Sequence, residues 1–564
     1  MCGIAGLIRY SGLTPADHYR AARLRSLLHH RGPDGDGLAF THVAALVQTR
    51  LALVDPAAYS LPLQSLNGRY TLLFNGEIYN HDALRQELAP FTNFQTRTDS
   101  EVVLAALLRW GHAALSRLEG MFSLFLWDNE EHTGFAAVDP LSVKPFLYHA
   151  SESQFAFSSE AGPLIETDIL PFRPGEEAIC EYLTAPYFSG ARELPFTNLR
   201  RLLPGHCLEL HNGRVTTAIY SLPRPEAPPL LTALGRAVSS HVRADSPVGL
   251  FLSGGVDSSL LAALAPEPLP AFTIRYPHRA EHYRDALIVT SDDLPFARRV
   301  AEMFAHPHHI VSPSNFGEAL ERTLRTNDLI AAWEQEVSQN VLAHAASAHV
   351  KAVLVGDAAD ETHYGYSFLL HPQRLTSPRQ LLDYFGHLPV RLPAAHFVDK
   401  YLAFTHSQGH NWHSPDDQRL AITCLIRNFW LTRLLHNGDI HLMAHGVEGR
   451  VPFAHPEVLA CGEQVPLSAA LLHGIEKHHL RSAASSVLPP DIAWRPKSAL
   501  TKNLAARGII HTLFRKYWAS HGALIEPYVH ANEVAALGPP VDDREAGLRF
   551  RLLALLVWFA RFSS

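Results

Sequence analysis

The stretch FLSGGVDSS, residues 251–259, joins an apolar run to a helical pattern. The apolar run over residues 248–252 predicts a buried strand, and the pattern over residues 256–265 predicts a helix. Gly254 and Gly255 allow a tight turn between them, whose backbone N–H groups can hold phosphate at the start of the helix. No Gly-Lys-Ser/Thr follows, so the turn is not a Walker A loop. The stretch therefore predicts an α/β domain with an anion-binding turn.

A proline-rich stretch, SLPRPEAPP at residues 221–229, separates two regions of different pattern and predicts a linker. Before it, short alternating strands are predicted near residues 70–74 and 121–127, with a helix near residues 100–110 between them. After it, a strand followed by a helix gives way to helical periodicity. A chain of 564 residues is too long for one core. The expected organisation is an α+β domain over residues 1–212, a linker over 213–229 and an α/β domain over 230–564.

The composition excludes several classes of protein. A net charge of -7 provides no basic field for nucleic acid. No apolar run has the length of a membrane span, and the most apolar one, residues 552–560, lies between Arg551 and Arg561 and predicts a buried terminal helix. The N-terminus lacks the charged lead and long apolar stretch of a signal peptide. We therefore expect a cytoplasmic protein that binds neither nucleic acid nor membranes.

The cysteines and histidines form no pattern of a metal or disulfide site. Five cysteines are scattered along the chain without a CxxC pair. The 35 histidines include the cluster His306-Pro-His-His309, which lacks a partner set at ligand spacing. We interpret this cluster as ordinary core or surface histidine.

Cys2 stands at an unusual position for a packed thiol. If Met1 is removed, Cys2 carries both a thiol and a free α-amine. The amine has an unperturbed pKa of about 7.7–8.0 and the thiol one of about 8.5, so the amine is matched to accept the proton of the thiol. Such a nucleophile brings its own base and needs no histidine.

Four further stretches follow Cys2 in a specific order: HRGPDG at 30–35, RLALVD at 50–55, NGEIYN at 75–80 and RTDSEV at 97–102. In this order and spacing they resemble the class II glutamine amidotransferase domain. The resemblance implies an N-terminal-nucleophile αββα sandwich in which Cys2 releases ammonia from glutamine. It also implies that the side-chain amide of Asn75 and the backbone N–H of Gly76 stabilise the oxyanion.

The same resemblance implies how glutamine is held. Arg50 would pair with its α-carboxylate through the guanidinium fork, and Asp99 would hold its α-ammonium. Glu77 would help to shape the pocket, to which Asn75 and Gly76 also contribute.

Three motifs of the second half carry a further resemblance: VGDAADETHYGY at 355–366, HGVEGRVPF at 445–453 and WRPKSAL at 494–500. With FLSGGVDSS, which is similar to the PP-loop of adenylating enzymes, and with the first domain, they resemble glutamine-hydrolysing asparagine synthetases over essentially the whole chain. The resemblance implies an ATP-dependent synthetase that uses Mg²⁺, and a homodimer. The ATP-binding residues implied are Phe251, Ser253, Gly254, Gly255, Asp257, Ser258, Ile274, Val355 and Gly356.

The resemblance also assigns the charged residues of this second site. Asp257 and Asp360 would hold Mg²⁺, and Lys497 would neutralise charge as pyrophosphate leaves, a role that suits a compact point charge. Asp357 stands where the family carries a glutamate that helps to form the adenylate or to deprotonate ammonia. An aspartate keeps the charge but sets the carboxylate one methylene further back.

Other departures concern the acceptor carboxylate. The family's Gly-Gly-Tyr is Tyr364-Gly365-Tyr366 here, and its Thr-Thr-x-Arg segment corresponds to Ile330-Ala-Ala-Trp333, which has neither hydroxyl nor guanidinium. A site without that guanidinium should hold a dicarboxylate poorly. Arg450 in GVEGR is a residue that could fold into the site and restore aspartate binding. Departures that bear on the coupling of the domains are Val138-Asp139, SSEAGPL at 158–164 and an insertion over 277–290.

Several functions are compatible with these motifs. The family default is the conversion of L-aspartate to L-asparagine, and the altered acceptor segment favours a different, larger or more apolar carboxylate. A β-lactam synthetase or peptide cyclase is disfavoured by Cys2 and its intact pocket. A non-synthesising glutaminase or regulatory paralogue is disfavoured by Asp257, Asp360 and Lys497.

Overall fold

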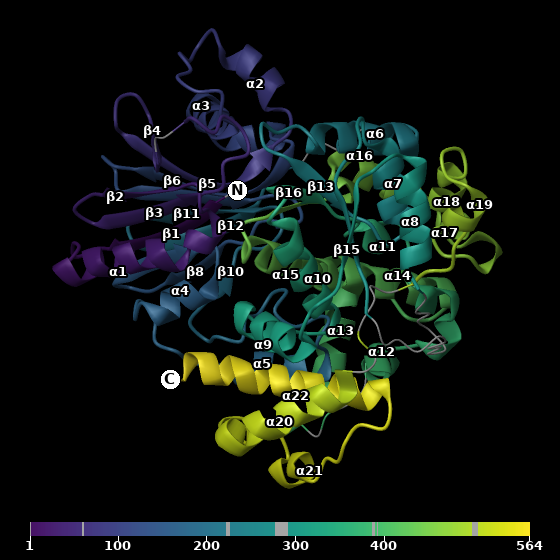
Figure 1. Cartoon of the computed structure of the whole chain (residues 1–564). Helices are drawn as coiled ribbons and strands as arrows, with labels where there is room; N and C mark the ends of the chain where they lie inside the picture. Colours follow the sequence, from purple (N-terminus) through teal and green to yellow (C-terminus); the bar gives the residue numbers. More distant parts are fainter. Residues whose placement is uncertain are drawn as a thin grey trace.

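The computed structural model describes residues 2–58, 61–221, 226–276, 292–385, 388, 390–391, 393–498, 503 and 506–563 (Figure 1). Met1, part of the proline-rich stretch, the insertion over 277–290, and Ala499 and Leu500 of the WRPKSAL motif lie outside the described residues. None of the helices in these ranges combines the length and hydropathy that a bilayer crossing requires.

The first domain contains two six-stranded antiparallel sheets. In spatial order the first sheet is β10 (Arg200–Arg201), β8 (Leu147–Ala150), β9 (Gln154–Ser158), β1 (Cys2–Arg9), β3 (Ala44–Arg50) and β2 (Gly35–Phe40). The second sheet is β12 (Arg214–Ile219), β11 (His206–His211), β7 (Thr133–Val138), β6 (Gly120–Asp128), β5 (Tyr70–Ile78) and β4 (Leu63–Gln64). Alternating side chains of the two sheets share an apolar core, which includes Ile4, Phe125 and Phe157.

Helices cover the outer faces of this sandwich. α1 (Pro15–Leu27) and α4 (Ala161–Glu166) contact the first sheet, and α2 (His81–Leu88) and α3 (Asp99–Trp110) pack on the second. The layers therefore follow the expected αββα order, and the strands and helix expected near residues 70–74, 121–127 and 100–110 are confirmed.

The second domain is built on a five-stranded parallel sheet. Its strands, in spatial order, are β15 (His308–Val311), β14 (Ala271–Ile274), β13 (Val248–Phe251), β16 (Ala352–Leu354) and β17 (Glu448–Arg450). Because the chain order reverses between β13 and β16, their carboxyl ends leave a crevice, which is where open α/β sheets bind ligands. FLSGGVDSS forms the end of β13, the turn and the start of α7 (Val256–Leu264), as predicted.

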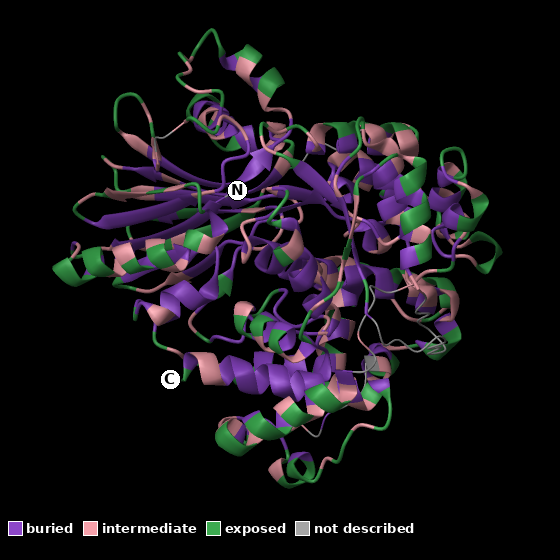
Figure 2. Cartoon of the chain, in the orientation of Figure 1, coloured by how far each residue is buried: buried purple, intermediate pink, exposed green. Residues whose placement is uncertain are grey.

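Helices surround this sheet and extend beyond it. They are α6 (Leu230–His241), α8 (Leu294–Met303), α9 (Phe316–Thr326), α10 (Gln335–Ala346), α11 (Ala359–Thr362), α12 (Pro378–Phe385), α13 (Ala394–Ser407), α14 (Pro415–Leu425), α15 (Leu431–Met443), α16 (Pro456–Gln464), α17 (Leu467–Ala470), α18 (His478–Ala484), α19 (Pro490–Ala493), α20 (Arg507–His521), α21 (Ala531–Ala535) and α22 (Asp543–Phe562). The predicted terminal helix is α22, and most of its length is buried (Figure 2).

The two domains share one continuous core. α5 (Glu176–Thr184) of the first domain lies beside α22 (Figure 1), and the Tyr182 hydroxyl donates to the carbonyl oxygens of Ala331 and Arg551 at 2.7 and 3.1 Å. Buried apolar residues of both domains therefore form a single cluster.

Part of the expected linker over residues 213–229 is a strand. Residues 214–219 form β12, which pairs along its whole length with β11 in an antiparallel register. The pairing satisfies backbone groups that a linker would leave to water. We therefore propose that the first domain ends after β12.

Candidate functional sites and the cavity between them

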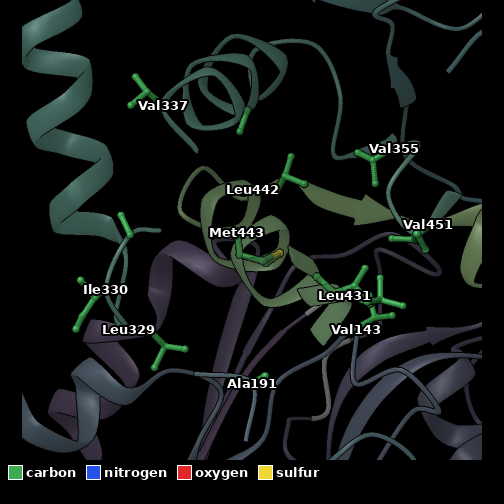
Figure 3. Close-up of a cluster of buried hydrophobic side chains, with 14 of the residues drawn as sticks. Val143, Ala191, Leu329, Ile330, Val337, Val355, Leu431, Leu442, Met443 and Val451 are labelled. Carbon is green, nitrogen blue, oxygen red and sulfur yellow. The ribbon is translucent and has the colours of Figure 1, made fainter. Parts of the chain in front are cut away.

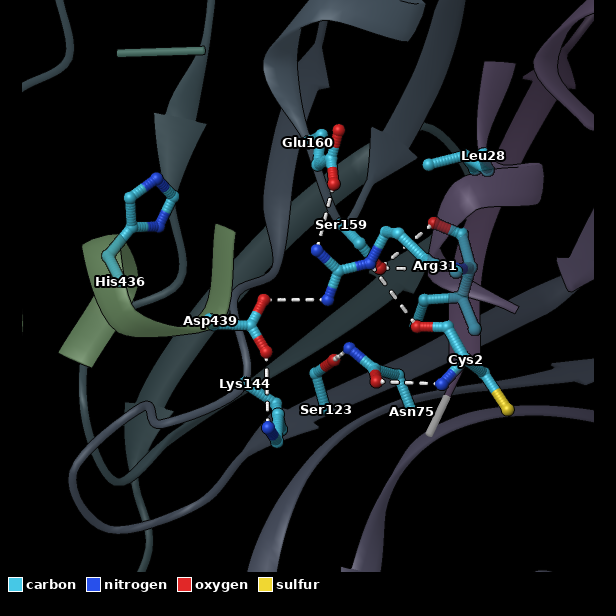
Figure 4. Close-up of polar contacts among 12 residues, drawn as sticks. Cys2, Leu28, Arg31, Asn75, Ser123, Lys144, Ser159, Glu160, His436 and Asp439 are labelled. Atoms are coloured by element: carbon cyan, nitrogen blue, oxygen red, sulfur yellow. Dashed lines mark hydrogen bonds and ion pairs between the residues drawn. The ribbon is translucent and has the colours of Figure 1, made fainter. Parts of the chain in front are cut away.

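The first candidate site surrounds Cys2, the first residue of β1. The backbone N–H of Cys2 donates to Oδ1 of Asn75 at 3.2 Å, and the Asn75 amide nitrogen donates to the Ser123 hydroxyl at 3.4 Å (Figure 4). Asn75 and Gly76 lie on β5 opposite β6. A Cβ at Gly76 would come within 2.3 Å of the carbonyl oxygen of Met121, so only glycine fits there. The structure thus places the predicted oxyanion residues beside the predicted nucleophile.

Arg50 and Asp99, the other two predicted glutamine-binding residues, are held by backbone groups of the first domain. Arg50 pairs with Cys2 in the register of β1 and β3, and its guanidinium donates to the carbonyl oxygens of Val54, Asp55 and Ala58. These bonds fold the loop after β3 around the side chain. Asp99, in the first turn of α3, accepts from the N–H groups of Ile78 and Ser100 at 3.1 and 2.8 Å.

Glu77 connects this pocket to the second domain. Its carboxylate lies 3.1 Å from the Arg450 guanidinium, which also contacts Glu448 at 2.5 Å and donates to the carbonyl oxygens of His241 and Arg243. Burial raises the pKa of Glu77 to about 8 although Arg450 opposes the shift. The expectation that Arg450 could enter the acceptor site is wrong, because β17 holds this fully buried side chain against Glu77 and Glu448.

The second candidate site is a cleft of about 880 Å³, partly open to solvent, at the carboxyl ends of β13, β14 and β16. Its lining includes most of the predicted ATP and catalytic residues: Phe251, Ser253, Asp257, Ser258, Ile274, Val355, Gly356, Asp357, Asp360 and Lys497. Gly254 and Gly255 form the turn below it. Gly254 has a positive φ of 69°, and a Cβ there would lie 2.5 Å from the backbone nitrogen of Ala297.

A lysine that the motifs did not identify lies at the centre of this cleft's charges. Lys477 has its Nζ 2.6 Å from Asp257 and 2.5 Å from Asp360, and the Lys497 ammonium also contacts Asp360. Although burial raises the pKa of Asp360, the two lysines lower it to about 2. One signal in the sequence could have drawn attention to Lys477. The chain has only 7 lysines against 41 arginines, so each lysine is an unusual choice of cation for this protein.

Asp357 lies next to this network and has the opposite pKa shift. Burial, and then the charge of Asp360, raise the pKa of Asp357 to about 6, while Lys497 opposes the shift. Glu361 behaves in the same way, since burial and the charge of Asp360 raise its pKa to about 7.

Ile330, Ala331, Ala332 and Tyr364 are buried, whereas Trp333 is partly exposed. Ala332 and Trp333 donate their backbone N–H groups to Glu336 at 2.7 and 3.3 Å. Tyr364 has a φ of 60°, and its ring lies 5.6 Å from the Arg427 guanidinium. The sequence did not predict this contact with Arg427.

The carboxylates of the cleft fit Mg²⁺ in their chemistry. Asp257 and Asp360 come from different loops and present oxygen atoms to the same lysine, and carboxylate oxygens are the ligands that Mg²⁺ takes together with phosphate. No group of three or more His, Cys, Asp and Glu side chains within the described ranges could hold a metal on its own. Asp257 and Asp360 would therefore need the phosphates of ATP to complete the coordination shell of Mg²⁺.

A small cavity of about 10 Å³, enough for roughly one water-sized molecule, lies between the two sites. Val143 and Lys144 of the first domain line one side, and Asp357 of the ATP cleft is also part of the lining. Much of the wall is apolar, and Val143, Val355, Leu442 and Val451 come together there (Figure 3).

Buried ion pairs connect this cavity to Cys2 (Figure 4). Asp439 of α15 lies 3.1 Å from Lys144 and 2.6 Å from Arg31. Arg31 also contacts Glu160 at 2.8 Å and donates from Nε to the carbonyl oxygen of Cys2 at 3.4 Å. All these side chains are almost fully buried.

Two family matches cover nearly the whole chain. Residues 1–221 match the family described as "Glutamine amidotransferase domain", and residues 230–560 match "Asparagine synthase". The chain belongs to the asparagine synthase family. It is a glutamine-dependent ligase of that family, as the sequence motifs predicted.

Individual relatives support the same assignment. A putative glutamine-hydrolysing asparagine synthetase of Mycobacterium tuberculosis is 28% identical, over 100% of this chain and 97% of the relative. The glutamine-hydrolysing asparagine synthetase 3 of Bacillus subtilis is 26% identical, over 89% of this chain and 87% of the relative. Asparagine synthetase B of Escherichia coli is 27% identical over 88% of this chain and 81% of that protein.

Proposed function

We propose that this chain amidates a carboxylic acid with ammonia that it releases from glutamine, while ATP is converted to AMP and pyrophosphate. The observation that carries the proposal is the small cavity whose lining extends from Lys144 of the first domain to Asp357 in the ATP cleft. A small neutral product that is made at one site and used at the other accounts for such a cavity.

Ammonia release would take place at Cys2 after removal of Met1. The thiol transfers its proton to the α-amine and attacks the side-chain amide of glutamine. The Asn75 amide and the Gly76 N–H stabilise the oxyanion. Ammonia leaves, and water hydrolyses the thioester to glutamate.

Activation of the acceptor would take place in the cleft. An oxygen of the acceptor carboxylate attacks the α-phosphorus of ATP, and pyrophosphate leaves. Lys477 and Lys497 neutralise the phosphate charge once they exchange Asp257 and Asp360 for phosphate oxygens. Asp257 and Asp360 would hold Mg²⁺, which supplies further charge neutralisation at the phosphates.

Amide formation would then take place beside Asp357. Ammonia attacks the acyl carbon, AMP leaves, and Asp357 takes the surplus proton. A base with a pKa near 6 is ionised at neutral pH and still accepts a proton. The apolar wall of the cavity favours neutral ammonia over ammonium.

The acceptor differs, in this proposal, from L-aspartate. The names of the relatives identify them as asparagine synthetases, but Ile330, Ala331, Ala332 and Trp333 offer no hydroxyl or guanidinium. Arg450, which could have replaced the missing guanidinium, is held by Glu77 and Glu448. Burying a second carboxylate without a partner is costly.

Two variants test the division of labour. Cys2→Ala should abolish glutamine-dependent amide formation and keep the ammonium-dependent reaction, whereas Asp360→Ala should abolish pyrophosphate release and keep glutaminase activity. Glutamate, pyrophosphate and amide are measured separately for each purified variant. If folded Cys2→Ala also loses the ammonium-dependent reaction, the assignment of two separate sites is wrong.

A further inference from the structure

A row of aromatic side chains begins at the carboxylates of the ATP cleft. The Tyr366 hydroxyl donates to Glu361, and its ring lies 4.8 Å from that of Trp430. Trp430 stacks on Tyr187 at 4.5 Å, and Tyr187 stacks on Trp333 at 5.2 Å with an angle of 13° between the rings. The aromatic row, defined as Tyr366, Trp430, Tyr187 and Trp333, thus connects Glu361 with the divergent acceptor segment.

Both ends of the aromatic row return to the reaction centre. Glu361 directly follows Asp360 in α11. Trp333 lies two residues before the start of α10, whose Gln339 lines the ATP cleft. A Cβ at Gly438 would lie 3.3 Å from the Gln339 amide and 3.4 Å from the Asp357 carboxylate, which places these two side chains near each other. Both ends of the aromatic row are therefore close in the chain to residues of the cleft.

The four rings of the aromatic row are partly exposed. In contrast, the core tryptophans Trp127 and Trp558 are 0% and 1% exposed. Trp430 also ends a π-helical segment, Ile426–Trp430, and such segments occur frequently at functional sites. Partial exposure leaves part of each ring accessible to a ligand, and the π-helix is a segment type common at functional sites.

Two guanidiniums beside the aromatic row already donate to backbone oxygens. Arg427 donates to the carbonyl oxygens of Glu361 and Thr362, and the buried Arg433 donates to that of Ile330. A second carboxylate of a ligand would compete with these bonds for a partner.

We propose that the acceptor is an aryl carboxylic acid, whose flat apolar ring packs against the aromatic row while its single carboxylate reaches the α-phosphate of ATP. Aromatic rings prefer offset-stacked or edge-to-face contacts with one another, so the row recognises a ring by shape and not by charge. This inference rests on the proposed function, because it names the substrate class of the same site.

A panel of acids tests the substrate class with the full-length protein, ATP and ammonium chloride. Pyrophosphate and amide are measured with 3-phenylpropionate, L-phenylalanine, L-aspartate and L-glutamate. At least one aryl acid should exceed L-aspartate about tenfold or more in kcat/KM. An equal or better reaction with L-aspartate overturns the inference and leaves the proposed function standing. If glutaminase activity is intact but no acid releases pyrophosphate, the proposed function fails, and the inference fails with it.

Two variants test the aromatic row itself. Trp333→Ala and Trp430→Leu should each raise the KM for the aryl acid about tenfold while leaving the KM for ATP and glutaminase activity unchanged. The matched control is Trp518→Leu on α20, whose ring packs on Phe514 and should leave the KM for the acid unchanged. Thermal melting identifies a variant that does not fold. In that case the KM of the other, folded variant tests the inference. An unchanged KM for the acid in a folded variant overturns the inference.

Discussion

Two buried carboxylates, Glu77 at the first candidate site and Asp360 at the second, have opposite pKa shifts. In the glutaminase pocket, burial raises the pKa of Glu77 to about 8 although Arg450 opposes the shift. In the ATP cleft, burial acts in the same direction on Asp360, but Lys477 and Lys497 lower its pKa to about 2. Glutamine carries no net charge, whereas ATP brings several negative charges. In the proposed reaction, phosphates of ATP would replace the carboxylates as partners of the two lysines.

Among the variants that test this comparison, one without Lys477 should show the largest loss of activity. In Lys477→Met, Asp257 loses its cation and the phosphates lose a charge that helps pyrophosphate to leave. Pyrophosphate release should fall about 100- to 1,000-fold, in the range seen when one charge-stabilising donor is removed from an active site. Glutamate production from glutamine should change less than about twofold, since the first domain does not use this lysine.

The matched control is Lys516→Met, whose side chain is 64% exposed and lies 3.2 Å from Glu321. It should keep both activities. Pyrophosphate release at the normal rate in Lys477→Met would show that the carboxylates of the cleft do not depend on this lysine.

The ion pairs between the two centres come next in expected effect. In Asp439→Asn, Arg31 loses one counter-charge and Lys144 its partner, although both stay buried. Breaking such a pair typically costs about 3–5 kcal/mol. The expected result is a clear fall in the thermal melting temperature, together with weaker coupling of glutamine hydrolysis to amide formation.

Asp416→Asn serves as the comparison for Asp439→Asn. Asp416 is 72% exposed and pairs with Arg419 at 2.7 Å, so its loss should cost less than about 1 kcal/mol. Similar melting temperatures for the two variants would contradict a stabilising role of the buried network.

The pH dependence of the ammonia reaction should show the smallest effect. Asp357 accepts a proton only when it is ionised, and burial and the charge of Asp360 raise its pKa to about 6. At a fixed concentration of free ammonia, the rate should therefore fall about tenfold per pH unit below pH 6 and level off above it. In Asp357→Asn, the rate of the ammonia reaction should be low at every pH and should not fall further below pH 6. The pH dependence of its glutaminase activity should stay unchanged. If the fall in rate below pH 6 persists in Asp357→Asn, a group other than Asp357 causes it.

Local patterns in the sequence were sufficient for much of the fold. The apolar run before Gly254 and the helical pattern after it predicted β13, the turn and α7, because hydrophobic period and glycine content act over a few residues. The strand β12 within the expected linker was not predicted, since a short polar strand resembles a loop until its partner β11 is known.

Motifs also located most residues of the two candidate sites. Asp257 and Asp360 follow β13 and β16, and parallel strands bring such loops to one edge of the sheet. Asn75 was expected beside Cys2 and lies there. The resemblance could identify these positions because each stands in a recognisable stretch of sequence.

The tertiary structure alone decided which charges meet. Lys477 is more than 100 residues from Asp257 and from Asp360 in the chain, and Arg31 lies in a different domain from Asp439. The sequence by itself determined local conformation and the chemistry of each motif, because both depend on neighbours along the chain. Packing between distant segments decides three other features, and no local pattern encodes it. They are the partners of Arg450, the aromatic row and the cavity at Asp357.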